Sequence, residues 1–154
     1  RALHFGRYGG DAERLLAPIF LGDPTLVRGY RADTFLASEC GVGASCPALT
    51  RLAGSRVAMA SVEWRVPLHT LLARGGGLVP GLELAPFVDA GLAWNGGDPV
   101  RLAFAEGSGR GIVASGGASL RLAAGGVRVE LTWARPWQRE GRGGIWTFGL
   151  VPAW

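Results

Sequence analysis

The sequence predicts an all-β protein, a segment of an antiparallel transmembrane β-barrel. Five segments alternate apolar side chains with small or charged ones at every second residue, as half-buried strands do. They run for about nine to thirteen residues, longer than the ~5–6 usual in soluble proteins and close to the ~9–11 that cross a bilayer at a tilt. Tryptophans lie near strand ends, and short connections alternate with long ones, which is typical of barrels with aromatic girdles.

The strands are expected, in chain order, at 57–66, 82–94, 111–123, 127–135 and 145–154. In the fourth, one face carries Val127, Val129, Leu131 and Trp133, and the other carries Arg128, Glu130 and Thr132. A sixth, weaker strand is expected within residues 1–9, and the apolar segment 15–22 could extend it or follow it. We expect the apolar faces to meet lipid and the polar faces to line a lumen.

The connections favour the same arrangement. Residues 124–126 form a short turn, whereas 31–55 and 95–110 are long, as expected for periplasmic turns and outer loops. A soluble antiparallel sandwich would also alternate and is the alternative. In hydrocarbon a sheet must close on itself, and six strands are fewer than the usual minimum of about eight. We therefore expect the chain to be the C-terminal part of a larger barrel, or to complete one with other chains.

Composition excludes some classes of function. The 154 residues carry 16 basic and 12 acidic side chains, and every basic residue is arginine. These arginines are scattered rather than gathered on one helix, which argues against nucleic-acid binding. No run of ~20 apolar residues is present, so no transmembrane helix is expected. The chain starts at Arg1 and holds its single methionine at position 59, so we expect an excerpt or a processed product.

The two cysteines, Cys40 and Cys46, have two glycines between them that let the chain bend back. A disulfide is expected if the compartment is oxidising, and free thiols or a metal site are the alternatives. A metal would need further ligands, and His4 and His69 are remote in sequence. We therefore expect no metal and no cofactor.

An enzyme is not expected. His4 and His69 have no nucleophile partner at a suitable spacing. Gly-Ser-Gly at 107–109 lacks the strand–turn–helix context of a nucleophile elbow. The glycine-rich stretches 74–77 and 108–111 precede no expected helix, so they are interpreted as turns rather than phosphate-binding loops.

Five motifs follow one another along the chain: LVRGY at 26–30, ASVEWRVPL at 60–68, FVDAG at 87–91, VELTWARPW at 129–137 and FGLVPAW at 148–154. Together they resemble the end of the BamA/TamA-type outer-membrane β-barrel superfamily, the bacterial surface antigen family that includes the transporters of two-partner secretion. VRGY and FxDxG are the specific pair. The resemblance implies a barrel of about sixteen strands, of which residues 1–154 supply about the last six. It also implies a long extracellular loop, 26–56, that folds back into the lumen.

The resemblance further implies a contact that holds this loop inside the barrel, here called the lumen lock. Its residues are Arg28, Gly29, Tyr30, Glu63 and Asp89. Arg28 is expected to contact Asp89, with Glu63 as a second acceptor. Phe87 and Gly91 complete the FxDxG motif around Asp89.

The residues alone favour the same pairing. Alternation places Asp89 and Glu63 on the lumen side of their strands, where an unpaired carboxylate is costly. A guanidinium has five donors and can bridge two carboxylates, and Gly29 permits the sharp bend of a loop tip. Two alternatives stay open. Arg28 could be a solvated loop residue, and Glu63 could pair instead with another lumen arginine, Arg65, Arg121 or Arg128.

The chain ends in an aromatic residue, as the family's barrels do, where the assembly machinery reads it as a folding signal. By resemblance this signal comprises Thr147, Gly149 and Trp154. Pro152 stands where an aromatic residue is commoner, and proline suits an edge strand because it cannot donate to a ladder. The alternative is that Trp154 is a girdle residue only.

The resemblance implies an integral protein of the bacterial outer membrane that takes part in the insertion or export of polypeptides. Its expected partners are outer-membrane lipids, the remainder of the barrel or other barrel chains, unfolded polypeptide substrates and assembly machinery. One alternative is a passive structural barrel that anchors an upstream soluble domain, and another is a soluble β-sandwich that binds a partner. Tandem polypeptide-transport-associated domains upstream would favour assembly, and a different upstream domain would favour the anchor.

Overall fold

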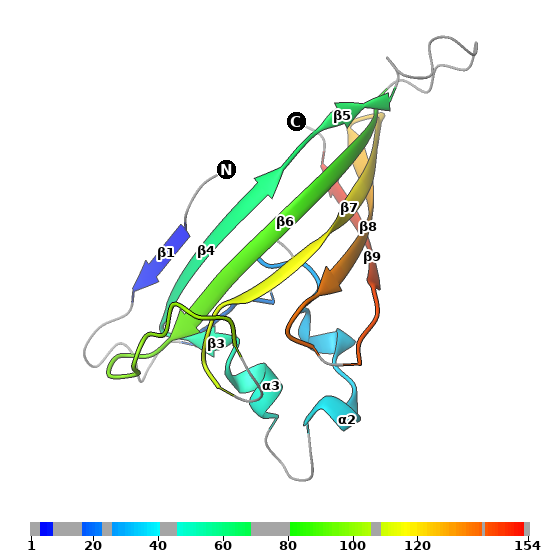
Figure 1. Ribbon diagram of the computed structural model, residues 1–154. Coiled ribbons are helices and arrows are strands. Elements are labelled where there is room, and N and C mark those ends of the chain that lie inside the picture. The colour runs from blue at the N-terminus through cyan, green and yellow to red at the C-terminus, as the bar shows by residue number, and fades with distance from the viewer. Residues whose placement is uncertain are drawn as a thin grey trace.

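The computed structural model describes residues 4–7, 17–22, 26–40, 46–68, 81–105, 109–139 and 141–152. These residues form a tall, curved wall of strands with a long loop folded against its inner side (Figure 1). Within these ranges, no helix is long and apolar enough to cross a membrane.

The wall is one antiparallel sheet in which the long strands pair with their neighbours in chain order. Its order is β1 (His4–Arg7), β4 (Arg56–Glu63), β6 (Leu82–Trp94), β7 (Val113–Ala124), β8 (Val127–Pro136) and β9 (Ile145–Pro152). A two-residue strand, β5 (Val66–Pro67), also pairs with β6. The prediction of an all-β, antiparallel barrel segment is confirmed.

Most strand boundaries lie close to the predicted ones, and two differ for visible reasons. The segment 57–66 divides into β4 and β5 because Trp64 faces Pro86 of β6, whose nitrogen carries no hydrogen, so the ladder has one bond there, from Trp64 N–H to the Pro86 carbonyl at 2.9 Å. The segment 111–123 becomes β7 only at Val113, because the N–H of Ile112 donates to Ala103 in the preceding loop at 2.8 Å. The last strand is described to Pro152, so residues 153–154 lie outside the described part.

The N-terminal segments form two separate elements. The expected strand within 1–9 is present as β1, and the segment 15–22 follows it as β2 (Ile19–Phe20) rather than extending it. Strand β2 pairs with β3 (Ala53–Gly54) in a small second sheet. Between them the loop carries η1 (Ala32–Thr34), α2 (Ala37–Cys40) and α3 (Pro47–Thr50).

The two ends of the wall differ in their connections. At the upper end of Figure 1, β7 and β8 join through Gly125 and Gly126, whose φ angles of 58° and 79° suit the tight turn of a two-residue hairpin. The long connections 95–112 and 137–144 and the helices α2 and α3 lie at the lower end. Residues 69–80, which connect β5 to β6 in the chain, lie outside the described residues.

The two faces of the wall differ as the alternation predicts. Large apolar side chains point outward and are exposed, among them Trp64 at 75%, Trp146 at 65% and Leu150 at 63%. On the inner side Asp89 is 1% exposed, and Ser115 beside it is fully buried. An exposed apolar belt with tryptophans opposite a polar inner side is the distribution expected of a barrel with lipid outside.

The inner side is not polar throughout. The loop residues Leu21, Val27 and Leu52 pack against Val57 and Val113 of the wall in one apolar core cluster. The sequence predicted a polar lumen, and the difference arises because the inward loop removes this part of the wall from water. The polar residues gather above the loop instead, and they form the candidate site.

Candidate functional site

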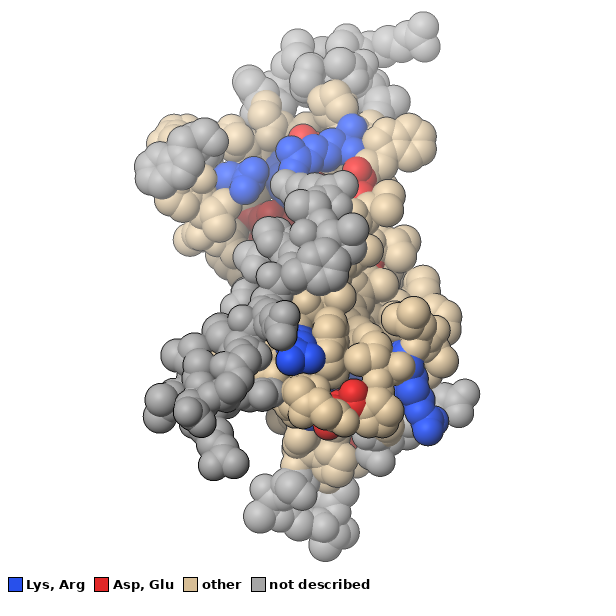
Figure 2. Space-filling model, turned by 90° about the vertical axis from the view of Figure 1, so that its left-hand side faces the viewer, with Lys and Arg blue, Asp and Glu red and all other residues tan. Residues whose placement is uncertain are grey.

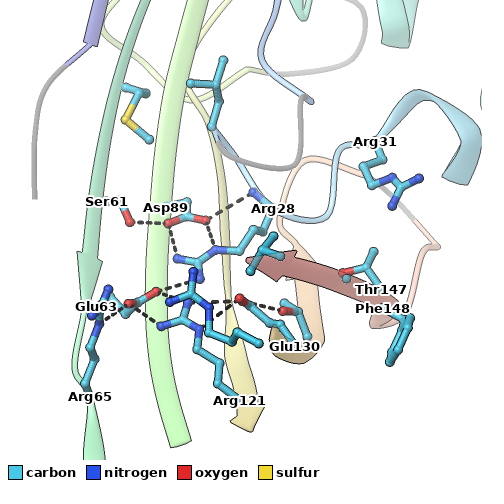
Figure 3. Close-up of a pocket in the computed structure, with 16 residues that line it drawn as sticks. Arg28, Arg31, Ser61, Glu63, Arg65, Asp89, Arg121, Glu130, Thr147 and Phe148 are labelled. Carbon is cyan, nitrogen blue, oxygen red and sulfur yellow. Dashed lines mark hydrogen bonds and ion pairs between the residues drawn. The ribbon is translucent and has the colours of Figure 1, made fainter. Parts of the chain in front are cut away.

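The VRGY segment lies deep against the inner wall. Val27 and Tyr30 are fully buried, and the N–H of Val27 donates to the carbonyl of Leu21 at 3.0 Å. Gly29 has a φ of 89°, a conformation that residues with a Cβ rarely adopt. This turn lets the apolar residues beside it pack into the core cluster while the side chain of Arg28 points toward Asp89 on β6 and Glu63 on β4 (Figure 3).

The guanidinium of Arg28 contacts two carboxylates. Its Nε and Nη2 donate to the two oxygens of Asp89 at 2.7 and 2.9 Å, a bidentate arrangement. Its Nη1 donates to Glu63 at 3.0 Å. The guanidinium carbon also lies 3.3 Å from the ring centre of Phe87, which places the cation on an aromatic face. The side chain of Arg28 is 15% exposed in this position.

Asp89 accepts further hydrogen bonds from the neighbouring strand β4 and from the loop. The hydroxyl of Ser61, its register partner on β4, donates to it at 2.7 Å, and the backbone N–H of Arg28 donates at 3.2 Å. Its register partner on β7 is Ser115. Asp89 thus accepts from one neutral hydroxyl of the neighbouring strand and, from the loop, from one neutral backbone N–H and one charged guanidinium.

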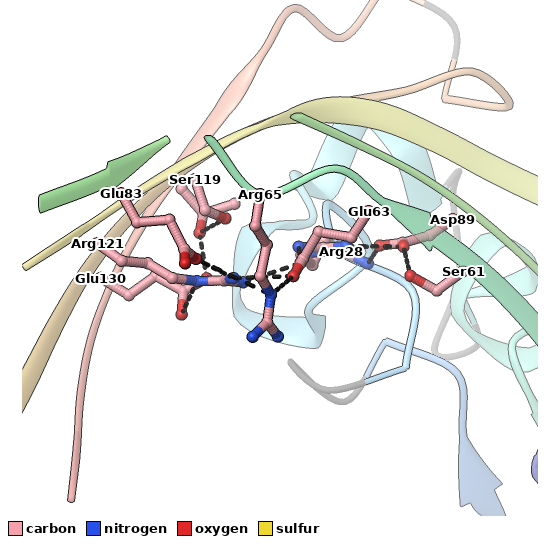
Figure 4. A network of polar contacts seen from close by, with 10 residues as sticks. Arg28, Ser61, Glu63, Arg65, Glu83, Asp89, Ser119, Arg121 and Glu130 are labelled. Carbon is pink, nitrogen blue, oxygen red and sulfur yellow. Dashed lines mark hydrogen bonds and ion pairs between the residues drawn. The ribbon is translucent and has the colours of Figure 1, made fainter. Parts of the chain in front are cut away.

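Glu63 is shared by three arginines. Arg121 of β7 binds both of its oxygens, at 2.8 and 2.9 Å, and the Nε of Arg65 binds one at 2.9 Å (Figure 4). Arg28 is the third. The sequence left open whether Glu63 pairs with Arg28 or with another lumen arginine. In the structure Glu63 accepts from the loop arginine and from wall arginines together.

The contacts continue across the wall as a row of charges. Glu83, Arg121 and Glu130 are register partners on β6, β7 and β8. The Nη1 of Arg121 lies 3.3 Å from Glu83, and its Nε lies 3.0 Å from Glu130. We call these residues, with Glu63 and Arg65, the ion-pair belt. Glu83 and Glu130 were not predicted as site residues, although their lumen-facing positions on the two strands that flank β7 were a readable signal.

An open cavity of about 650 Å³ lies beside the belt, lined by five arginines and three acidic residues. Arg31 and Arg128 line it in addition to the residues described above. Figure 2 shows one face of the molecule, and in its upper half arginine side chains lie in a row beside acidic ones. Among the described residues, no cluster of three His, Cys, Asp or Glu could hold a metal ion. The arrangement suits ion pairing and the holding of a segment in place.

The glycine of FxDxG makes room for the loop. A Cβ on Gly91 would lie 2.7 Å from the Val27 side chain and 2.9 Å from that of Leu21. These contacts are too close for a side chain at this position. The motif therefore provides a carboxylate for Arg28 and, two residues later, a flat surface for the loop's apolar residues.

Tyr30 fastens the loop to β7 and to the connection that follows β8. Its hydroxyl lies 3.0 Å from the Ala114 carbonyl and 2.9 Å from the side-chain oxygen of Gln138, and it accepts from the Gln138 N–H at 3.2 Å. Burial raises the pKa of the Tyr30 hydroxyl, so it stays a neutral donor. Residues 28 and 30 thus bind different parts of the wall.

The other predicted residues are placed as follows. Cys40 and Cys46 form a disulfide, which confirms the prediction. Thr147 and Gly149 lie on β9, and Gly149 is the register partner of Glu130. His69 and Trp154 lie outside the described residues.

A comparison with protein-family models matches residues 3–150 to the Omp85 superfamily domain. Searches among curated proteins and among solved structures return no match. Members of the matched superfamily are outer-membrane β-barrels that act in the assembly and transport of proteins, in agreement with the wall described above.

Proposed function

The chain belongs to the Omp85 superfamily, and we propose that it is the C-terminal portion of an outer-membrane β-barrel that takes part in inserting or exporting polypeptides. In this proposal the barrel is integral to the bacterial outer membrane, and further strands of the same protein or of other chains complete it. Residues 26–56 are its long extracellular loop. Trp154, with Gly149 and Thr147, is its C-terminal folding signal. Lipids, unfolded polypeptides and assembly machinery are its partners.

The pairing of Arg28 with Asp89 is the observation that carries the proposal. The two residues are 61 positions apart, one in a loop and one on the inner wall. A loop that only covered the mouth of a barrel would need no buried cation at its tip. The contact supports a lumen lock, in which Arg28 holds the loop inside the barrel and Gly29 and Tyr30 fit it to the wall.

The strength of such a lock follows from burial. The side chain of Asp89 is 1% exposed and that of Arg28 is 15% exposed. Withdrawal of the loop would leave a buried carboxylate without its cation, which costs about 3–5 kcal/mol. The loop therefore stays in place unless a cation or water reaches Asp89 as it leaves.

The cavity beside the lock is also lined by residues of β9, an edge strand of the sheet among the described strands. Among the described strands, β9 pairs with β8 on one side and with none on the other. Pro152, at its end, cannot donate a ladder hydrogen bond. We infer that the seam beside β9 is weakly paired, and that the locked loop stabilises the wall while this edge receives a polypeptide.

The test is insertion by the complete barrel in lipid vesicles. An unfolded eight-stranded barrel protein, diluted from urea, serves as the polypeptide, and its insertion is followed by protection from protease. We expect vesicles with the protein to insert it faster than empty vesicles. We expect Arg28→Ala to remove most of this acceleration, whereas the exposed neighbour variant Arg31→Ala retains it.

A passive structural barrel gives a different result. It would leave the rate of insertion at that of empty vesicles, and Arg28→Ala would then change stability alone. Equal rates with and without the unmodified protein would therefore overturn the proposed activity in favour of the anchor.

A further inference from the structure

Arg139, in the connection between β8 and β9, lies buried among residues of the long loop. Its side chain is 1% exposed. Its Nε and Nη2 donate to the two oxygens of Glu39, each at 2.8 Å, in a second bidentate pair. The residue is 100 positions from Glu39 in sequence. Neither residue was assigned to the site from the sequence.

The remaining donors of this guanidinium also bind the loop. Nη1 donates to the Gly29 carbonyl at 2.9 Å and to the Thr34 hydroxyl at 3.0 Å, and Nη2 donates to the Thr34 carbonyl at 2.8 Å. A guanidinium has five N–H donors, and all five are used. Its carbon lies 3.7 Å from the ring centre of Phe35. Every one of these partners lies between residues 29 and 39.

Two features make these contacts relevant to the lock. One acceptor is the carbonyl of Gly29, directly beside Arg28, so Arg139 fixes the backbone that carries the lock arginine. The second feature is that Glu39 is adjacent to Cys40, whose disulfide to Cys46 restrains the end of α2. The carboxylate is thus presented by a segment with little freedom to move away.

We propose that Arg139 is a positioning residue for the lumen lock, which joins the β8–β9 hairpin to the loop that carries Arg28. The hairpin and the loop then move as one body. Further bonds run between the same parts, from Arg51 to the Gln138 carbonyl at 2.6 Å and from Arg142 to the Thr34 carbonyl at 3.1 Å. Because β9 is the last described strand, withdrawal of the loop also displaces the hairpin beside the proposed seam.

The meaning of this joint for polypeptide insertion rests on the proposed function, but the joint itself can be tested apart from it. Nitroxide labels on the complete barrel at Leu36 and Val88, which are 48% and 47% exposed, report the distance from the loop to the wall by pulsed electron paramagnetic resonance. The native disulfide stays oxidised throughout. We expect a narrow distance distribution in the parent protein.

Arg139→Ala is expected to broaden this distribution at least twofold. Arg139→Lys is expected to broaden it nearly as much, because an ammonium has three donors on one atom and cannot match five spread acceptors. The control is Arg135→Ala, on β8 just before this connection, which is exposed and removes none of the bonds described above, so it should leave the distribution narrow. Should Arg139→Ala fail to fold, Glu39→Gln keeps the shape, removes the charge and should broaden the distribution.

An unchanged distribution in Arg139→Ala, or its full restoration in Arg139→Lys, would overturn the positioning role. The insertion assay separates this outcome from failure of the proposed function. A loop released by Arg139→Ala with insertion unchanged would overturn the link to polypeptide insertion and leave the joint intact.

Discussion

Replacement of Arg28 by alanine removes three charged hydrogen bonds and one aromatic contact at once. The consequences for the two carboxylates are unequal. Glu63 keeps Arg121 and Arg65, which bind both of its oxygens. Asp89 keeps only the Ser61 hydroxyl and the backbone N–H of residue 28 among the donors described above. Most of the cost of this substitution therefore arises at Asp89.

The magnitude follows from the burial of Asp89. Removing one partner of a buried ion pair costs about 3–5 kcal/mol, because the other charge is left without compensation. Asp89 keeps two hydrogen bonds from neutral donors, so we expect a loss in the lower part of this range, at about 3–4 kcal/mol. Arg31 pairs with Asp33 at 2.7 Å, but both side chains are exposed, so Arg31→Ala should cost less than about 1 kcal/mol.

The assay is unfolding of the complete barrel by urea in detergent micelles, followed by tryptophan fluorescence. We expect Arg28→Ala to lower the free energy of unfolding by about 3–4 kcal/mol, and Arg28→Lys to lower it by roughly half as much, because lysine keeps one charge and loses the bidentate geometry. In an Asp89→Asn background, Arg28→Ala should cost much less, since the stranded charge is gone. Equal stability of Arg28→Ala and the parent, or equal losses in both backgrounds, would refute this account.

Three further predictions concern the loop. Gly91→Ala should cost about 1–3 kcal/mol in the same urea assay, because its Cβ overlaps two buried side chains, whereas Gly143→Ala, with no atom within 4 Å of its Cβ, should cost little; equal effects would contradict the packing argument. A maleimide should label neither Cys40 nor Cys46 before reduction and both afterwards, and reduction should cost about 2 kcal/mol; labelling of the unreduced protein would show an open bridge. The hydrogen bond from its arginine partner lowers the pKa of Glu39 below the ordinary 4.5, so this group stabilises the fold above about pH 4.5 and that contribution is lost as the pH falls through the lowered pKa. Thermal midpoints should therefore fall on acidification more steeply in the parent than in Glu39→Gln, and parallel curves would count against it.

The faces of the strands could be predicted because the pleat itself sets a period of two. The segment 82–94 was predicted to the residue, and its lumen-facing Asp89 lies on the inner side. The pairing of Asp89 with Arg28 needed one more idea, that a carboxylate in a confined space requires a cation. The resemblance of the VRGY and FxDxG motifs to the family identified Arg28 as this cation. These inferences depend on local patterns and on charge, which a sequence displays directly.

Other features depend on register and on irregular backbone, which the sequence does not display. The break after Glu63 is caused by Pro86, and it is visible only once the two strands are aligned. The role of Arg139 was missed because it lies in a connection without a period, and its partner Glu39 lies on a four-residue helix. Such a helix is too short to leave a recognisable pattern.

The ion-pair belt also distinguishes the native register of the strands from a register shifted by two residues. A slip of two residues keeps every apolar side chain on the lipid side, so alternation by itself tolerates it. The same slip moves one strand by roughly 6.6 Å along its neighbour and separates Arg121 from the acidic residues now within 3.3 Å of it. The apolar residues thus determine which face of each strand meets lipid, and the charged residues determine the register of that strand against its neighbours.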